Sequence, residues 1–162
     1  EHAIEALCEK YFILRTSWVF SAHGSNFVKT MVNMATTREK INVVTDQTGI
    51  PTSARFLATT ALATLQHGGF GLYHTVCSGV TNWADFAQYI LTEAKKYPEF
   101  KILKDAEINS ITSAGYPTNA ARPKNSVLNC AKWQSAFGIA APVWKSEVDQ
   151  VLRELAILRS GS

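Results

Sequence analysis

Short apolar runs alternate with amphipathic segments along almost the whole chain, and this alternation constrains the fold more than any other feature. Residues 11–20 form a nearly continuous apolar run, which is typical of a strand covered on both faces in a parallel sheet. Helical spacing follows at residues 26–38, with Phe27, Met31 and Met34 on one side. Strand-like runs that alternate with helices predict an α/β architecture.

Capping residues and helix breakers set the other expected elements. Further strands are predicted at residues 41–44, 71–77 and 108–112. Further helices are predicted where a cap precedes, or Gly or Pro follows, an apolar periodic segment: residues 53–66, 83–96, 130–137 and 144–158. Residues 1–10 have the pattern of the end of a helix without an N-cap, so we expect the chain to be part of a longer protein. The strands are too few for a complete doubly wound domain with its own nucleotide site.

Composition and charge narrow the class of protein. Hydrophobic residues make up 46% of the chain and charged residues 18%, and the net charge of +3 is not gathered into a basic run, so nucleic acid is not expected as a partner. No stretch approaches the roughly 20 apolar residues that cross a bilayer. Cys8, Cys77 and Cys130 lack the spacing of a zinc site. We interpret them as reduced, mostly buried thiols of a cytoplasmic protein.

Five segments of the sequence carry a family resemblance. In chain order they are LRTSWVF at 14–20, NFVKTM at 26–31, DQTGIPT at 46–52, GLYH at 71–74, and YPT at 116–118 with ARPKNS at 121–126. In this order and at these distances they resemble the C-terminal half of extended short-chain dehydrogenases of the dTDP-4-dehydrorhamnose reductase group. The run LNCAKW at 128–133 then leads into the last helix, as in that family, so the resemblance covers essentially the whole chain.

The resemblance implies a fold and a domain organisation. Residues 1–162 would be the C-terminal, substrate-binding portion of a reductase, with the last strands of a Rossmann-like doubly wound sheet and a small substrate-binding subdomain. The dinucleotide-binding part and the catalytic tyrosine and lysine would precede residue 1. In agreement, the nine glycines never take the G-x-G-x-x-G spacing of a dinucleotide site. Tyr97 and Lys101 match the family's Y-x-x-x-K spacing, but Pro98 disfavours helical geometry at Tyr97, so we interpret this match as a coincidence.

The resemblance also implies an activity. The complete protein would reduce the 4-keto group of dTDP-4-dehydro-L-rhamnose with NADPH or NADH, giving dTDP-L-rhamnose, whereas residues 1–162 alone would be inactive. The partner would be a nucleotide-sugar substrate, and both a homodimer and a bound metal are left open. Two alternatives stay open as well. One is a non-catalytic binding subunit of the same family, like the regulatory subunit of methionine adenosyltransferase, and the other is a related sugar-nucleotide epimerase or dehydratase.

Four residues are predicted to contact the substrate. Trp18 ends an expected strand, and in open α/β sheets ligands bind beyond the carboxyl ends of strands; it also matches the family's substrate-contacting tryptophan. Asn26 begins a helix, where it can act as an N-cap or help the helix N-terminus to bind a diphosphate. Arg122 matches a family arginine whose guanidinium suits a diphosphate, although a lone arginine is ordinarily a surface residue. Gln47 lies in a loop that could line the pocket or serve turn geometry alone.

Two residues are predicted to lie beside the cofactor. Thr16 and Ser17 match positions that pass the nicotinamide in the family, although polar residues in a strand also form local hydrogen bonds. Arg55 stands where some relatives carry an acidic residue, which weakens any inference of a metal or dimer contact there. The tryptophans on amphipathic helices are expected to belong to the core: Trp83, Trp133 and Trp144.

Overall fold

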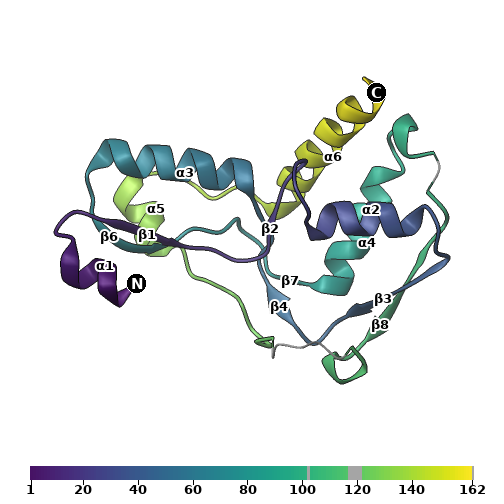
Figure 1. Ribbon diagram of the computed structural model, residues 1–162, viewed down its shortest axis with the longest axis horizontal. Coiled ribbons are helices and arrows are strands. Elements are labelled where there is room, and N and C mark those ends of the chain that lie inside the picture. Colours follow the sequence, from purple (N-terminus) through teal and green to yellow (C-terminus); the bar gives the residue numbers. More distant parts are fainter. Residues whose placement is uncertain (102, 117–121, 162) are drawn as a thin grey trace.

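The computed structural model describes residues 1–101, 103–116 and 122–161, and they form an elongated molecule with two parts (Figure 1). One part contains a parallel pair of strands with three helices beside it: β1 (Phe12–Arg15), β6 (Gly71–His74), α1 (His2–Leu7), α3 (Ala54–His67) and α5 (Ala131–Phe137). The other part contains a second parallel pair and the other three α-helices: β3 (Lys40–Val44), β8 (Glu107–Ile111), α2 (Phe27–Ala35), α4 (Trp83–Ala94) and α6 (Trp144–Ser160). The predicted α/β class is confirmed.

Short strands join the two parts. They are β2 (Val19–Phe20), which pairs in parallel with β5 (Thr52–Ser53), and β4 (Thr48–Gly49), which pairs antiparallel with β7 (Thr81–Asn82). Two 3-10 helices complete the described elements, η1 (Pro98–Phe100) and η2 (Ser113–Gly115). Among the described residues, no helix has both the length and the apolar character of a membrane span. Part of the predicted loop with the YPT and ARPKNS segments, residues 117–121, lies outside the described residues.

The predicted helix starts follow from side-chain caps. Asn26, Ser53 and Asn82 each accept a hydrogen bond from a backbone N–H in the first turn of α2, α3 and α4, at 3.3, 3.0 and 2.9 Å. Gly68 and Gly138 end α3 and α5 with φ values of 69° and 65°, the left-handed conformation that glycine adopts without steric cost.

The expectation of one continuous strand at residues 11–20 is wrong. The backbone breaks between β1 and β2, because Trp18 adopts a φ of 50° and is the only described non-glycine residue with a positive φ. As a result β1 pairs with β6, whereas β2 turns to pair with β5. The first strand is also less covered than predicted, since Phe12, Ile13 and Leu14 are only half-buried and Arg15 is exposed.

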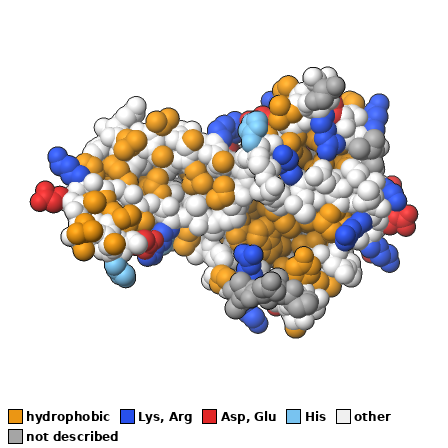
Figure 2. Space-filling view, in the orientation of Figure 1, with side chains coloured by type: hydrophobic (Ala, Val, Ile, Leu, Met, Phe, Trp, Pro, Cys, Tyr) orange, Lys and Arg blue, Asp and Glu red, His pale blue; other side chains and the backbone are white. Residues whose placement is uncertain are grey.

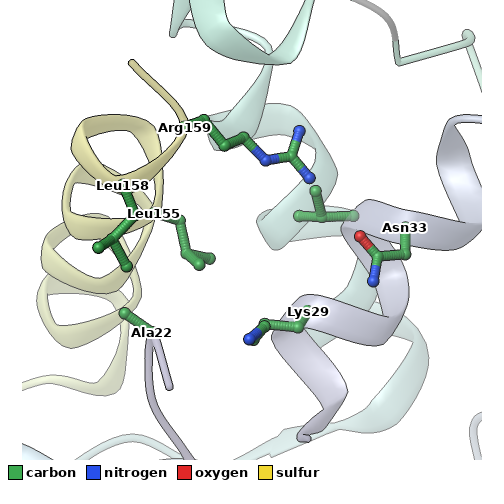
Figure 3. A pocket seen from close by; sticks show the side chains of 7 residues that line it. Ala22, Lys29, Asn33, Leu155, Leu158 and Arg159 are labelled. Carbon is green, nitrogen blue, oxygen red and sulfur yellow. The ribbon is translucent and has the colours of Figure 1, made fainter. Parts of the chain in front are cut away.

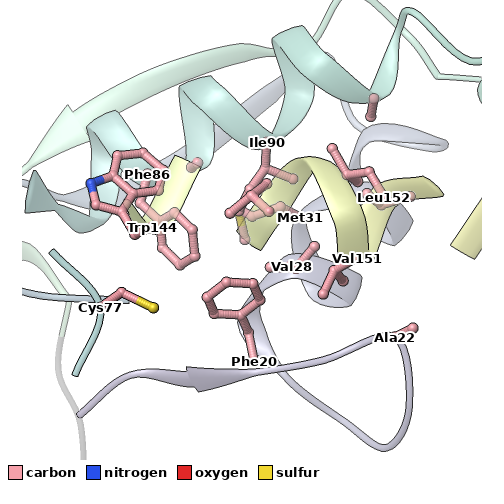
Figure 4. Close-up of a cluster of buried hydrophobic side chains, with 14 of the residues drawn as sticks. Phe20, Ala22, Val28, Met31, Cys77, Phe86, Ile90, Trp144, Val151 and Leu152 are labelled. Atoms are coloured by element: carbon pink, nitrogen blue, oxygen red, sulfur yellow. The ribbon is translucent and has the colours of Figure 1, made fainter. Parts of the chain in front are cut away.

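The core of the second part lies around α4. This helix packs against α2, α6 and the β3–β8 pair, so its apolar side chains are enclosed on several sides. Figure 4 shows side chains from different elements meeting in this core: Phe20, Val28, Met31, Phe86, Ile90, Trp144, Val151 and Leu152. Fully burying one such side chain stabilises the folded state by roughly 1.5–3 kcal/mol. The cluster therefore holds α4, including its first turn, in place.

A buried carboxylate links α6 to α3. Glu147 is 5% exposed, accepts a hydrogen bond from the Ser53 hydroxyl, and lies 3.2 Å from the Arg55 guanidinium. Ser53 thereby caps α3 and also satisfies the carboxylate. Arg55, which stands where some relatives carry an acidic residue, therefore forms an ion pair with Glu147 of the same chain.

We expect Ser53→Ala to lower the free energy of unfolding by about 2–4 kcal/mol, because it removes both a helix cap and a donor to a buried carboxylate. Asn82→Ala is the matched control, since it removes a cap but no contact with a buried charge, and it should cost about 1 kcal/mol. Urea denaturation of both variants makes the measurement. Equal losses would show that the Glu147 contact contributes nothing to stability.

The three cysteines are all free and should differ in reactivity. Cys8 is exposed, Cys130 is half-buried, and burial raises the pKa of the Cys77 thiol to about 11. At pH 8 only about one-thousandth of Cys77 would be thiolate, the reactive form. We therefore expect an aromatic disulfide reagent to modify Cys8 rapidly and Cys77 only after unfolding. Rapid modification of Cys77 in the folded protein, located by mass spectrometry, would contradict this.

Candidate functional site

A cleft of about 440 Å³ opens beyond the carboxyl end of β1. It brings together five of the six predicted site residues from three distant stretches of sequence. The described residues that line it are Thr16, Ser17, Trp18, Gln47, Trp83, Arg122, Pro123, Asn125, Ser126 and Leu128. Figure 2 shows hydrophobic side chains gathered over β7 and the start of α4, with a cationic side chain close by. An aromatic wall beside a cation suits a ligand with both a ring and an anionic group.

Trp18 forms the aromatic wall of the cleft together with Trp83. The two rings are stacked, with centroids 3.7 Å apart and planes inclined by 14°. The Trp18 carbonyl accepts a hydrogen bond from Thr52 N–H at 3.2 Å, which ties the backbone to β5. Gly49 passes so close to the indole that a Cβ there would lie 2.5 Å from Cε2 of Trp18. The indole therefore depends on glycine at position 49.

Thr16 and Ser17 lie next to one another on the chain but differ in their hydrogen bonding. The Ser17 hydroxyl donates to the Ile50 carbonyl oxygen at 3.0 Å, which uses its proton within the protein. The Thr16 hydroxyl oxygen is buried and has no hydrogen-bond partner among the described residues. Because an unpaired buried hydroxyl is costly, Thr16 is the better placed of the two to bond a bound group.

Gln47 is held at the cleft by the segment around η2. Its amide nitrogen donates to the Ser113 hydroxyl at 3.0 Å. The same hydroxyl donates to Asp46 at 2.7 Å, and the Ser113 backbone N–H donates to Asp46 at 2.8 Å. These bonds, the side-chain one foremost, lower the pKa of the Asp46 carboxyl. The sequence predicted a loop here, and the structure adds the contacts that order it.

Arg122 shortly precedes Asn125, which forms an isolated parallel bridge with Thr48 of β4. Thr48 N–H donates to the Lys124 carbonyl, and Ser126 N–H donates to the Thr48 carbonyl, both at 2.8 Å. Arg122 itself is exposed, and no carboxylate of the described residues lies within ion-pair distance of it. Its guanidinium is therefore available to an anion that enters the cleft.

Asn26 is the one predicted site residue that does not line the cleft. Its amide oxygen caps α2, and its amide nitrogen donates to the carbonyl oxygens of Ser21 and His23 at 2.8 and 3.3 Å. The capping interpretation is thereby confirmed, while the diphosphate role stays a prediction. Phe27, the next residue, contacts Trp83 with ring centroids 4.5 Å apart, so the start of α2 braces the aromatic wall.

The expectation that the helix tryptophans belong to the core is correct for Trp133 and Trp144, whereas Trp83 packs against the core and also lines the cleft. Trp83 is half-buried and lines the cleft, but the other two are 1% and 5% exposed. An amphipathic helix pattern cannot separate these cases, because Trp83 occupies the first turn of α4, where the apolar side meets the cleft. Its position directly after the Asn82 cap was the signal available in the sequence.

Tyr97 and Lys101 do not form a catalytic pair. Tyr97 has extended backbone angles and precedes a 3-10 helix rather than lying in an α-helix, as Pro98 predicted. The Tyr97 hydroxyl donates to the Asp149 carbonyl oxygen at 3.4 Å.

Residues 1–101, 103–116 and 122–161 contain no group of three His, Cys, Asp or Glu side chains arranged to hold a metal.

A second hollow of about 320 Å³ lies between α2 and α6 (Figure 3). Lys29 and Asn33 come from α2, and Arg159 reaches across from α6 with its guanidinium carbon 4.6 Å from the centre of the Phe100 ring. None of the six predicted site residues lines it. The cleft at Trp18 is therefore the candidate site.

Parallel strands flanked by helices, with a cleft beyond the carboxyl end of one strand, define a protein of the Rossmann-like α/β class. Residues 1–157 match the family model described as the RmlD substrate binding domain. The chain therefore belongs to that family, and the resemblance read from the sequence is confirmed.

Three relatives place the match in context. The chain is 40% identical over 160 residues to dTDP-4-dehydrorhamnose reductase of Escherichia coli strain K12, covering 96% of this chain and 53% of the relative. A dTDP-4-dehydrorhamnose reductase structure from Clostridium acetobutylicum is 32% identical with a TM-score of 0.86, covering 95% and 52%. One from Bacillus anthracis, in complex with NADP, is 29% identical with a TM-score of 0.84, covering 94% and 51%. The chain thus spans about half the length of these relatives.

We expect Gly49→Ala to displace the Trp18 indole, because the new Cβ would overlap it, and to cost roughly 1–3 kcal/mol of stability. Near-ultraviolet circular dichroism and urea denaturation measure the two effects. Gly115→Ala is the matched control, since neither glycine has a positive φ and the nearest atom to a Cβ at Gly115 is 3.9 Å away. An unchanged tryptophan spectrum in Gly49→Ala would contradict the close packing.

Proposed function

We propose that this chain is the substrate-binding part of an NAD(P)H-dependent reductase that converts dTDP-4-dehydro-L-rhamnose to dTDP-L-rhamnose. Family membership and the names of the relatives support the activity. The observation that carries the proposal is the convergence of Trp18, Gln47 and Arg122 on one cleft. This set offers an indole wall, an amide and a guanidinium that has no ion-pair partner among the described residues, which together suit a sugar joined to a diphosphate.

In this proposal the residues of the cleft bind and orient the substrate. Trp18, backed by Trp83, forms the wall against which the sugar lies and shields it from water on that side. Arg122 pairs with the diphosphate, because a guanidinium fork matches two phosphate oxygens. Gln47, held by Ser113, forms hydrogen bonds with polar groups of the substrate that lie between Trp18 and Arg122. Fixing the sugar in this way positions its 4-keto carbon for reduction.

The cofactor proposal rests on Thr16. Its buried, unpartnered hydroxyl fits a neighbouring polar group such as the nicotinamide amide, whereas the Ser17 hydroxyl is already bonded to Ile50. When bound, NADPH or NADH supplies the hydride for the carbonyl carbon. In this proposal the carbonyl oxygen takes its proton from the family's tyrosine, which lies outside residues 1–162.

We further propose that a preceding dinucleotide-binding part continues the β1–β6 sheet. Among the described residues β1 pairs only with β6, so its other edge has backbone groups that can pair with a further parallel strand. The half-buried side chains of β1 and the twofold greater length of the relatives agree with such a continuation. The chain without that part is expected to be inactive.

The first test compares residues 1–162 with the complete protein that carries them. With dTDP-4-dehydro-L-rhamnose and NADPH, we expect nicotinamide oxidation only by the complete protein. Turnover by residues 1–162 alone would contradict the proposal that activity requires the preceding dinucleotide-binding part. Binding of the nucleotide sugar by the complete protein without any turnover would instead favour the non-catalytic binding subunit, and preference for a uridine diphosphosugar would favour a related epimerase.

The second test concerns Arg122. In the complete protein we expect Arg122→Ala to raise KM about 10- to 100-fold, the range for losing a charged hydrogen-bonding partner. Arg122→Lys should recover only part of the loss, because it keeps the charge but not the fork. Arg153→Ala, an exposed arginine on α6 away from the cleft, is the control. Equal KM values for Arg122→Ala and the control would refute the diphosphate contact.

A further inference from the structure

The backbone at Trp18 is in a conformation that tryptophan rarely adopts. A φ of 50° brings Cβ close to the neighbouring backbone, so a bulky residue stays there only when its surroundings hold it. One hydrogen bond, from Thr52 N–H to the Trp18 carbonyl, holds the main chain. The contacts of the indole must therefore contribute to keeping this residue in place.

Trp83 makes one of these contacts by stacking on the indole. Its ring lies 3.7 Å from that of Trp18 and nearly parallel to it, while Gly49 packs against the Trp18 indole as well. Trp83 is itself braced, because Phe27 and Phe86 lie 4.5 and 6.1 Å from it between ring centroids. The ring on which Trp18 stacks is thus held by contacts with side chains of two helices, α2 and α4.

The β4–β7 pair couples these two supports. Gly49 pairs with Thr81, and Thr48 pairs with Asn82, the residue that caps α4 immediately before Trp83. The same short ladder therefore sets both the glycine beside the Trp18 indole and the tryptophan stacked on it. A change in either support alters the position of the indole relative to the cleft.

We propose that Trp83 is a positioning residue, which holds the Trp18 indole in the orientation that lines the cleft. This inference rests on the proposed function, in which the substrate sugar lies against Trp18. With Trp83 in place, the indole is ordered before the ligand arrives, so binding does not have to order it. Without Trp83, the wild-type orientation is one of several, and the apparent affinity falls by the fraction of molecules that adopt it.

The loss should appear in binding rather than in the chemical step. Stacked aromatic pairs contribute an interaction equivalent to about a three- to tenfold change in an equilibrium constant. We therefore expect Trp83→Leu in the complete protein to raise KM by about three- to tenfold with little change in kcat. Trp83→Phe should recover much of the affinity, because it retains a ring on which Trp18 can stack.

Circular dichroism of the protein without ligand tests the stacking directly. Two indoles stacked this closely couple their transitions, and a skew between their transition dipoles gives a paired positive and negative band in the far ultraviolet. Trp83→Leu, Trp83→Phe and Trp18→Phe should each abolish this couplet, whereas Trp144→Phe, which removes a core tryptophan that contacts Phe86 and Tyr89, should retain it. A couplet that persists in Trp83→Leu would overturn the stacking.

The closing experiment combines the spectrum with affinity for thymidine diphosphate and steady-state kinetics of the complete protein. Loss of the couplet with a raised KM, and recovery of KM in Trp83→Phe, supports the inference. Loss of the couplet with an unchanged KM in a folded Trp83→Leu variant overturns it while leaving the proposed function intact. Wild-type protein that neither binds thymidine diphosphate nor reduces the sugar overturns the proposed function, on which the inference rests.

Discussion

The left-handed backbone conformation of Trp18 determines how the two parts of the molecule meet. Before it, β1 runs beside β6 in one part, and after it β2 turns to β5 and leads the chain into α2. The same left-handed conformation places the indole in the space beyond the end of β1, where open α/β sheets bind their ligands. A strand that continued straight through residues 11–20 would place Trp18 within a sheet. The place of Trp18 at the cleft therefore depends on a φ that is unfavourable for tryptophan.

Interactions distant in sequence stabilise that conformation and assemble the site. Gly49 leaves room for the indole, Trp83 stacks on it, and the β4–β7 ladder fixes both. The 124–126 segment pairs with Thr48, which brings Arg122 to the same cleft. Each contact is modest in energy, but all depend on one short stretch of backbone, so they are expected to form and to be lost together.

Local signals in the sequence were sufficient for much of the fold. Asn26 and Ser53 were predicted from their side-chain chemistry as helix caps, and both cap helices, because that chemistry acts within one turn. The break at Trp18 could not be predicted in this way, since an apolar run gives no sign of a positive φ that only tertiary contacts support. Resemblance to a family identified Arg122, and its place in a Gly/Pro loop suggested Gln47; the cleft contains both. Trp83 was missed because a half-buried ring beside a cleft has the same helical spacing as a core ring.

Binding of the nucleotide sugar in the cleft at Trp18 can be followed at the tryptophans themselves. The most direct measurement labels the complete protein and follows the indole N–H resonances of the four tryptophans within residues 1–162 during titration with dTDP-L-rhamnose. The account predicts that the Trp18 and Trp83 signals shift with saturation, while those of buried Trp133 and Trp144 stay nearly constant. Saturable binding that leaves the Trp18 and Trp83 signals unchanged would contradict it.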